Sequence, residues 1–315
     1  MRTPPPFVPM LVDRGARRIE RAPAGYPRTM RRSSTGTLPR PPSQLRPPFE
    51  FHGRVGTQPV VATAIHAGHD VRDEVARDLA LAEGDRRREE DPHTDRIIAP
   101  FDTRAVVHRS RFEVDLNRTR DEAVYSADDE TWGLDTWRRP LPQAVVRRSR
   151  AIYDDFYARL GALLDDLAER GPFVLLDVHS YNHRRGGPEA APDDPAENPD
   201  LNVGTGSLDR ARWAPVVDAF MDSCSGVEVA GRPLDVRENV RFEGAHLAEW
   251  VHGRYPDTGC ALALEFKKTF MDEWTGEVDR SHLQQLAEVV QQAASVIAVA
   301  IGDVEAVGDA SARAR

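Results

Sequence analysis

The stretch FVLLDVHSY, residues 173–181, combines five apolar residues with an aspartate and then carries a histidine near its end. An apolar run of this length directly after Gly171-Pro172 is typical of a strand that is buried on both faces. The runs VVATAI (60–65) and CALALEF (260–266) have the same character. The chain is therefore predicted to contain at least three buried strands.

Segments with a helical pattern separate these strands. In residues 141–170, apolar side chains such as Ile152, Phe156 and Leu160 recur at helical spacing. Further helices are expected at 72–82, from about Asp95, and at 208–222, 244–254 and 282–301, with short strands at 104–118 (two, or one bent strand) and 201–206. Alternating strands and helices predict an α/β fold, a three-layer α/β/α sandwich around a mixed central sheet.

Composition divides the chain into three parts. Residues 1–48 contain eleven prolines and ten arginines. Such a segment has too few apolar side chains to form a core, so we expect a disordered tail. Residues 49–302 are expected to form a single domain, and residues 303–315 a frayed C-terminal tail.

Several classes of protein are disfavoured by the same composition. The net charge of −9 argues against nucleic-acid binding. The sequence has no run of 18 apolar residues, so neither a membrane-spanning helix nor a membrane partner is expected. Cys224 and Cys260 lack the spacing of a disulfide framework, which favours a cytoplasmic location. The glycine-rich motifs that bind nucleotide phosphates are also missing from the sequence.

A titratable side chain lies at or just after the end of each of the three buried strands. His66 follows the first strand, His179 lies near the end of the second, and Glu265 lies near the end of the third. In α/β sheets, ligands bind beyond the carboxyl ends of the strands. Two histidines and a carboxylate, with one position left open, are the ligands of a catalytic zinc site, and a nearby glutamate can take a proton from water. The alternative is that each histidine only satisfies a hydrogen bond in the core.

Five short motifs resemble segments of known hydrolases, and their order along the chain matches as well. DVHSY (177–181), VDLNR (114–118) and ALALEF (261–266) resemble segments of zinc carboxypeptidases. HAG (66–68) and EDPHTDRI (90–97) make the closer resemblance one to the N-formylglutamate amidohydrolase family of the same superfamily. The resemblance spans roughly residues 58–300 and implies a zinc carboxypeptidase-like fold, with residues 49–302 as the catalytic domain.

The resemblance also implies a set of metal ligands. A Zn²⁺ ion would be held by His66, His179 and a carboxylate, either Asp95, which we favour, or Asp91. Zinc carboxypeptidases have a glutamate three residues after the first histidine, where this chain has His69. The N-formylglutamate amidohydrolase family lacks that glutamate too, and has a downstream pair of aspartates instead.

Roles for the remaining site residues follow from the same resemblance. Glu265 would be the general base, and Arg111 would stabilise the oxyanion. Asn117 and Arg118 would hold a substrate carboxylate, because the planar fork of an arginine donates two parallel hydrogen bonds to that group. Tyr181, next to the proposed ligand, would also contact the substrate.

The sequence therefore predicts a zinc-dependent amidohydrolase that acts on an N-acyl amino acid such as N-formylglutamate. The first alternative is a carboxypeptidase-like enzyme with the same metal site and a short peptide as substrate. The segment HSYNHRRGG (179–187) leaves this alternative open, because it differs from the Met-Pro that usually follows His-Ser in the amidohydrolase family. The second alternative is an accessory protein that keeps the fold without the chemistry.

Overall fold

A mixed sheet of seven strands, in the order β1-β3-β2-β4-β9-β5-β8, forms the centre of the protein. It is seen in a computed structural model that describes residues 45–53, 58–126, 131 and 133–313, with side chains up to residue 304. Most of the predicted tail lies outside these residues. The strands are β1 (Phe49–His52), β2 (Val60–Ala64), β3 (Arg104–Val107), β4 (Phe173–Tyr181), β5 (Leu201–Gly204), β8 (Val236–Glu238) and β9 (Gly259–Lys267), with a separate hairpin of β6 (Glu228–Val229) and β7 (Arg232–Pro233).

Strand directions agree with the predicted mixed sheet. The four adjacent strands β3, β2, β4 and β9 run parallel. At the two sides of this group, β1 pairs antiparallel with β3, and β5 pairs antiparallel with β9. Because the central strands are parallel, their carboxyl ends meet at one edge of the sheet, where a ligand site is expected.

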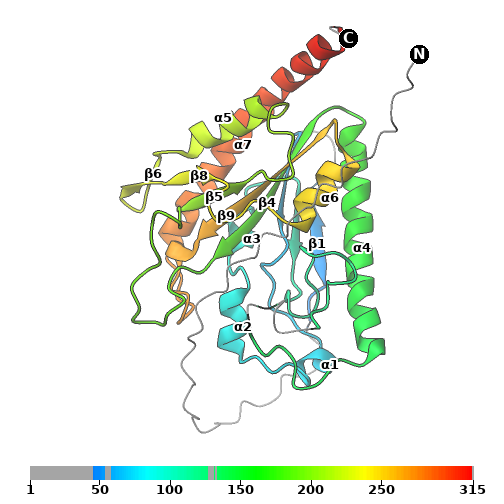
Figure 1. The fold of residues 1–315 in the computed structure, drawn as a ribbon, viewed down its shortest axis with the longest axis vertical. Helices are drawn as coiled ribbons and strands as arrows, with labels where there is room; N and C mark the ends of the chain where they lie inside the picture. Colours follow the sequence, from blue (N-terminus) through cyan, green and yellow to red (C-terminus); the bar gives the residue numbers. More distant parts are fainter. Residues whose placement is uncertain (1–44, 54–57, 127–130, 132, 314–315) are drawn as a thin grey trace, which may run out of the picture. The chain divides into compact units, whose positions relative to one another are not determined.

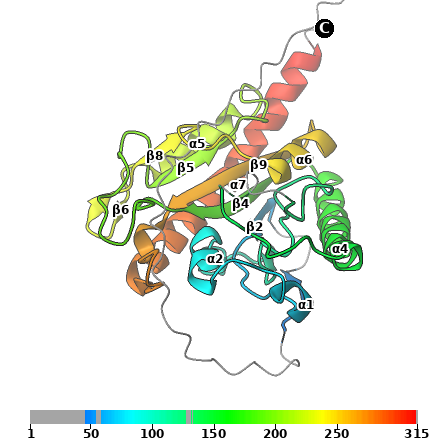
Figure 2. The ribbon, with the colours of Figure 1, turned by 60° about the horizontal axis from the view of Figure 1, so that its bottom comes forward.

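Helices cover both faces of the sheet, which confirms the three-layer prediction (Figures 1 and 2). The helices are α1 (Asp73–Ala76), α2 (Glu83–Glu89), α3 (Thr94–Ile97), α4 (Gln143–Ala168), α5 (Ala214–Cys224), α6 (His246–Arg254) and α7 (Arg280–Arg313), with the short 3₁₀ helix η2 (Lys268–Phe270). One core lies between the sheet and α4 and α6. The other lies between the sheet and α5 and α7.

Along the central strands, successive side chains point to opposite faces of the sheet, and this determines which of them reach the site. In β4, Leu176 packs toward α5 and α7, whereas Leu175 packs toward α4 and α6. Successive side chains of a strand point to opposite faces, so Asp177 and His179 lie on the same face as Leu175. In β9 the same rule places Glu265 on this face. The apolar part of each strand forms the core, and the carboxyl end of the same face carries titratable groups.

Helix α7 is long and apolar enough, by length and composition, to cross a membrane between Arg280 and Val304. Part of its surface belongs to the core next to α5, where Val290, Ala293 and Ile297 are buried. Helices that pack in a protein core also meet these two criteria of length and composition, and the buried residues of α7 make it such a helix. The helix continues to Arg313, past residue 302, where we expected the domain to end.

The long elements agree with the sequence prediction, and several short ones do not. The helix predicted at 72–82 is wrong beyond its first turn, because α1 ends at Ala76 and Leu79 forms a bridge with Trp137 instead. Strand structure at 104–118 ends at Val107. The following residues turn to bring polar side chains to the site.

Candidate metal centre

Three elements bring His66, Asp91 and His179 together. His66 follows β2, and His179 lies near the end of β4. Asp91 follows the last residue of α2 by two positions, and its backbone N–H donates to the His66 carbonyl at 3.0 Å. Ligand-type atoms of the three side chains all lie within 4.8 Å of one another, and all three residues are buried.

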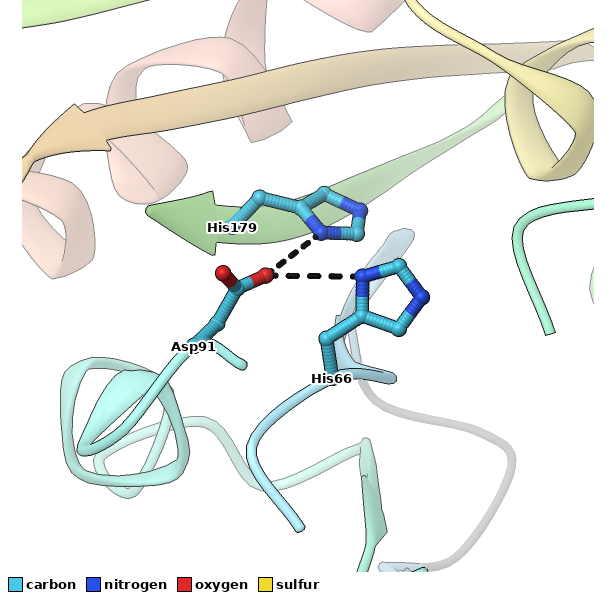
Figure 3. A group of neighbouring side chains, drawn as sticks. All are labelled: His66, Asp91 and His179. Atoms are coloured by element: carbon cyan, nitrogen blue, oxygen red, sulfur yellow. Dashed lines mark hydrogen bonds and ion pairs between the residues drawn. The ribbon is translucent and has the colours of Figure 1, made fainter. Parts of the chain in front are cut away.

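The two imidazoles present the same ring atom to Asp91 (Figure 3). Nδ1 of His179 lies 2.9 Å from Oδ2 of Asp91, and Nδ1 of His66 lies 3.5 Å from that oxygen. The ring centroids are 4.9 Å apart. The three atoms therefore converge on one point.

The other ring atom of each histidine is fixed by a buried carboxylate. Nε2 of His66 donates to Asp115 at 2.7 Å, and Nε2 of His179 donates to Asp177 at 2.8 Å. Asp177 is fixed in turn by the Thr63 hydroxyl at 2.7 Å. A carboxylate that accepts from one ring nitrogen leaves the other as a lone-pair donor, and such partners orient metal-ligating histidines.

The electrostatics of the group favour a positive charge at this point. Burial opposes a charge on His179, yet Asp177 raises the pKa of this imidazole well above its usual value. Burial also opposes ionisation of Asp91, yet His179 and His66 hold the pKa of this carboxyl well below its usual range. A divalent cation would meet this requirement with the histidines neutral.

A second observation, at a ring nitrogen of His66, also fits a metal ion at this place. Nδ1 of His66 is buried and has no hydrogen-bond partner among the described residues. A buried polar atom without a partner is costly, so such atoms usually have a missing ligand or water. Two nitrogens and one carboxylate oxygen, with a position left open, match a catalytic zinc site.

The structure places the two candidate aspartates differently. Asp91 lies between the histidines, whereas Asp95, the carboxylate favoured from the sequence, lies on α3. A cavity lies at the two histidines. Among the described residues, Asp91 lines this cavity and Asp95 does not. His69 is not a member of the group of three, and its Nδ1 pairs with Glu90 instead.

Glu265 lies beside this group, where the sequence predicted a general base. It pairs in register with His179 on the neighbouring strand and is only partly exposed. Burial raises the pKa of Glu265 to about 7, with the nearby carboxylate of Asp91 adding to the rise. A carboxylate with such a pKa can accept and return a proton near neutral pH.

Arg111 and Arg118 line the same cavity, which has a volume of about 310 Å³. Nη2 of Arg111 donates to Asp115 at 2.8 Å. The Arg118 side chain is 30% exposed, with Nε 3.7 Å from Asp115 and its guanidinium 5.0 Å from the Tyr125 ring. The Arg118 side chain is therefore partly exposed where it lines the cavity.

Asn117 and Tyr181 also line this cavity, but their polar groups have partners in the protein. Oδ1 of Asn117 accepts from the backbone N–H of Leu247 at 2.9 Å, and its Nδ2 lies 3.4 Å from Nε2 of His179. The Tyr181 hydroxyl donates to the Pro199 carbonyl. The ring of Tyr181 is buried, with Phe242 at 5.4 Å between ring centroids and the Arg241 guanidinium at 5.2 Å.

Asp115 is a central residue of the site that the sequence did not reveal. Besides His66 and Arg111, it accepts from the Tyr125 hydroxyl and from the backbone N–H of Asn117. Arg111 and His66 hold the pKa of Asp115 well below its usual value although burial opposes this. Its place inside the VDLNR motif was the available signal.

Residues 58–271 match the sequence profile of the N-formylglutamate amidohydrolase family. No curated protein matches the chain. Solved structures with a similar fold include an N-formylglutamate amidohydrolase from Ralstonia eutropha JMP134, with 17% identity, a TM-score of 0.59, and coverage of 82% of this chain and 98% of that one. A gene product of Agrobacterium tumefaciens gives 15% identity, a TM-score of 0.57, and coverage of 82% and 96%.

A metallo-carboxypeptidase from Pseudomonas aeruginosa is a more distant match, with 14% identity, a TM-score of 0.33, and coverage of 78% of this chain and 57% of that one. A TM-score this low carries no argument about the site. The family match covers more than half of the chain and includes every residue of the candidate site. This chain therefore belongs to the N-formylglutamate amidohydrolase family, a family of hydrolases that act on amide bonds.

Proposed function

We propose that this protein is a zinc-dependent amidohydrolase that removes the acyl group from an N-acyl amino acid such as N-formylglutamate. The observation that carries the proposal is the convergence of Nδ1 of His66, Nδ1 of His179 and the Asp91 carboxylate, with both Nε2 atoms already paired to carboxylates. That arrangement supports a metal-assisted hydrolase over an accessory protein that has lost the chemistry.

His66, Asp91 and His179 would hold the ion. Zinc bound there would supply Lewis-acid activation of a water molecule and of the substrate carbonyl. Imidazole nitrogen and carboxylate oxygen are ligands that zinc accepts in tetrahedral sites, and three protein ligands leave a fourth position for the reacting groups. Asp115 and Asp177 would keep both rings in the required orientation.

Glu265 would carry the proton during hydrolysis. As water attacks the amide carbonyl, Glu265 takes a proton from it, and as the carbon–nitrogen bond breaks, it returns the proton to the leaving amine. The positive charge of Arg111, which lines the cavity, would stabilise the carbonyl oxygen as it becomes negative.

Arg118 would select the substrate by its free carboxylate. Its side chain is partly exposed and lines the cavity together with Asn117 and Tyr181. A charge-assisted pair with a carboxylate in such a partly desolvated place contributes about 1.5–3 kcal/mol. The substrate class is therefore an amino acid with its carboxylate free and its amine acylated.

A turnover assay tests this function. Purified protein is given N-formylglutamate, other N-acyl amino acids and a panel of short peptides, before and after removal of metal by a chelator. We expect hydrolysis of the N-acyl amino acids to exceed that of the peptides, to cease on chelation and to return with zinc. Faster cleavage of the peptides would favour the carboxypeptidase alternative. Metal-loaded protein that hydrolyses none of these compounds would favour the accessory role.

A further inference from the structure

Lys268 is buried beside the candidate metal centre and has hydrogen-bond acceptors for all three of its ammonium protons. The residue is 1% exposed and lies directly after β9. Its Nζ donates to the Arg88 carbonyl at 2.6 Å, to the Glu90 carbonyl at 2.7 Å and to Oδ1 of Asn182 at 3.1 Å. An ammonium has three protons to donate, so its capacity is used in full.

The acceptors of Lys268 belong to the segments that carry the site. Glu90 immediately precedes Asp91, and Asn182 follows His179 by three residues. Lys268 itself follows Glu265 by three residues on the same run of chain. The single ammonium therefore joins the Asp91 segment to the ends of β4 and β9, the two strands that carry His179 and Glu265.

We propose that Lys268 is a positioning residue that holds Asp91 at the distance from His179 needed to bind the metal, an inference that rests on the proposed function. The backbone of this segment is held at the Asp91 N–H by the His66 carbonyl and at the Arg88 and Glu90 carbonyls by Lys268. Without the ammonium, two buried carbonyls would lose their donor, and the segment would move to find other partners. Partners of this kind outside the ligand set commonly change metal affinity by 10- to 100-fold.

The choice of lysine at this position supports the proposal. Of the 42 basic residues in the chain, only Lys267 and Lys268 are lysines. A compact ammonium can donate to three acceptors arranged around one point, whereas the planar fork of an arginine cannot. Position 268 is thus a place where the side chain used elsewhere in this protein would not fit the acceptors.

Lys267 provides a matched control one residue away. Its Nζ donates to the Asn198 carbonyl at 2.8 Å and lies 2.9 Å from Oδ1 of Asp200. Neither partner belongs to the candidate metal group or lines the cavity among the described residues. Replacing Lys267 therefore removes a lysine charge and its contacts without touching the Asp91 segment.

The test is the zinc dissociation constant, measured by competition with a chromophoric chelator at a temperature where each metal-free protein is folded. We expect Lys268→Met and Lys268→Arg to weaken zinc binding by about 10- to 100-fold, and Lys267→Met to stay within about 2-fold of the wild type. Thermal unfolding of the metal-free proteins is followed in parallel. A merely structural role would lower the unfolding temperature and leave the dissociation constant unchanged.

Unchanged zinc affinity in the folded Lys268 variants, or an equal loss in Lys267→Met, would overturn the inference. If Lys268→Met does not fold, Lys268→Arg and Asn182→Ala decide by the same criterion, the second with a loss of about 2- to 10-fold, the factor that corresponds to one hydrogen bond. A wild-type protein that binds no zinc would instead contradict the proposed function, so the two failures are distinguishable.

Discussion

His66 and His179 illustrate how single residues are prepared for metal binding. Each ring is held at Nε2 by a buried carboxylate, and each presents Nδ1 to Asp91. The orientation of each ring is therefore set before a ligand arrives. Fixing these degrees of freedom in advance is what gives a catalytic site its precision, because little ordering remains to be done on binding.

We predict that replacing Glu265 lowers turnover without removing the metal. Glu265→Gln keeps the shape of the side chain and removes the base, so the metal content should stay while turnover falls by about 10²- to 10⁴-fold. Metal analysis and a turnover assay on the same sample check this. Loss of the metal together with the activity would make Glu265 a ligand and refute its assignment as the base.

At Arg118 we predict discrimination by the substrate carboxylate. Arg118→Ala should lower kcat/KM for N-formylglutamate by roughly 10- to 150-fold, because a charge-assisted pair is lost. The loss should be much smaller for the diamide, in which both carboxylates are replaced by amides, and Arg118→Lys should recover only part of the activity, since lysine lacks the fork. Equal losses on both compounds would mean that Arg118 is structural.

The carboxylate ligand shows what the sequence could and could not predict at this scale. Strand ends identified His66, His179 and Glu265, because a buried strand fixes both the place and the face of its last residues. Asp91 lies in the connection between α2 and α3, and Asp95 lies on the four-residue α3, where sequence spacing does not set the direction of a side chain. Their roles depend on how α2 and α3 pack, and only the structure shows that Asp91 faces the histidines.

At the scale of elements, the turn after β2 places His66. Gly68 in this turn packs against the backbone of the next strand's end, and a Cβ at this position would lie 2.2 Å from the carbonyl carbon of His108. No side chain fits there without displacement. The close approach explains why the turn carries glycine two residues after the histidine.

We predict that Gly68→Ala destabilises the fold and weakens zinc binding. The displaced turn should cost about 1–3 kcal/mol of unfolding free energy, as overpacking does, and His66 should move with it. Gly84→Ala in α2 is the matched control, because a Cβ there meets nothing within 4 Å. Denaturant unfolding and zinc titration of both variants check this. A Gly68→Ala protein as stable and as tightly zinc-binding as the control would refute it.

Length decided which elements were predictable from sequence. The runs that became β4, β9 and α4 are long enough for their periodicity to be unambiguous. The short strands β6, β7 and β8 have two or three residues each, and they exist because a partner strand is present. Such pairing is a tertiary effect that local patterns do not contain.

At the scale of the whole molecule, we expect stability to depend on a histidine that lies outside the candidate metal group. His252 on α6 accepts the backbone N–H of Ala261 at Nε2, 2.9 Å away, and its Nδ1 lies 2.8 Å from the Ser207 hydroxyl. Burial lowers the pKa of His252 to about 4. Protonation would remove the acceptor that ties α6 to β9.

We predict that this histidine makes unfolding pH-dependent. As the pH falls below about 6.5, the unfolded chain binds the proton first, so the free energy of unfolding should decline down to about pH 4, by at most about 1.4 kcal/mol per pH unit. In His252→Gln this contribution should be missing. Denaturant unfolding of both proteins between pH 4 and 8 checks this, and identical pH dependences would refute it. Other histidines titrate in both proteins and cancel in the difference.

The fold as a whole gathers groups that are far apart in sequence at one edge of the sheet. Parallel β2, β4 and β9 end together, and the segment after α2 closes over them. The central claim is that His66, Asp91 and His179 together bind a metal ion.

The most direct test of this claim is the metal content per chain of the wild type, Asp91→Asn and Asp95→Asn, measured by elemental analysis after purification and dialysis. We predict about one zinc per chain in the wild type and in Asp95→Asn, and little or none in Asp91→Asn, because an amide is a much poorer zinc ligand than a carboxylate. Full metal in Asp91→Asn together with loss of metal in Asp95→Asn would contradict the account.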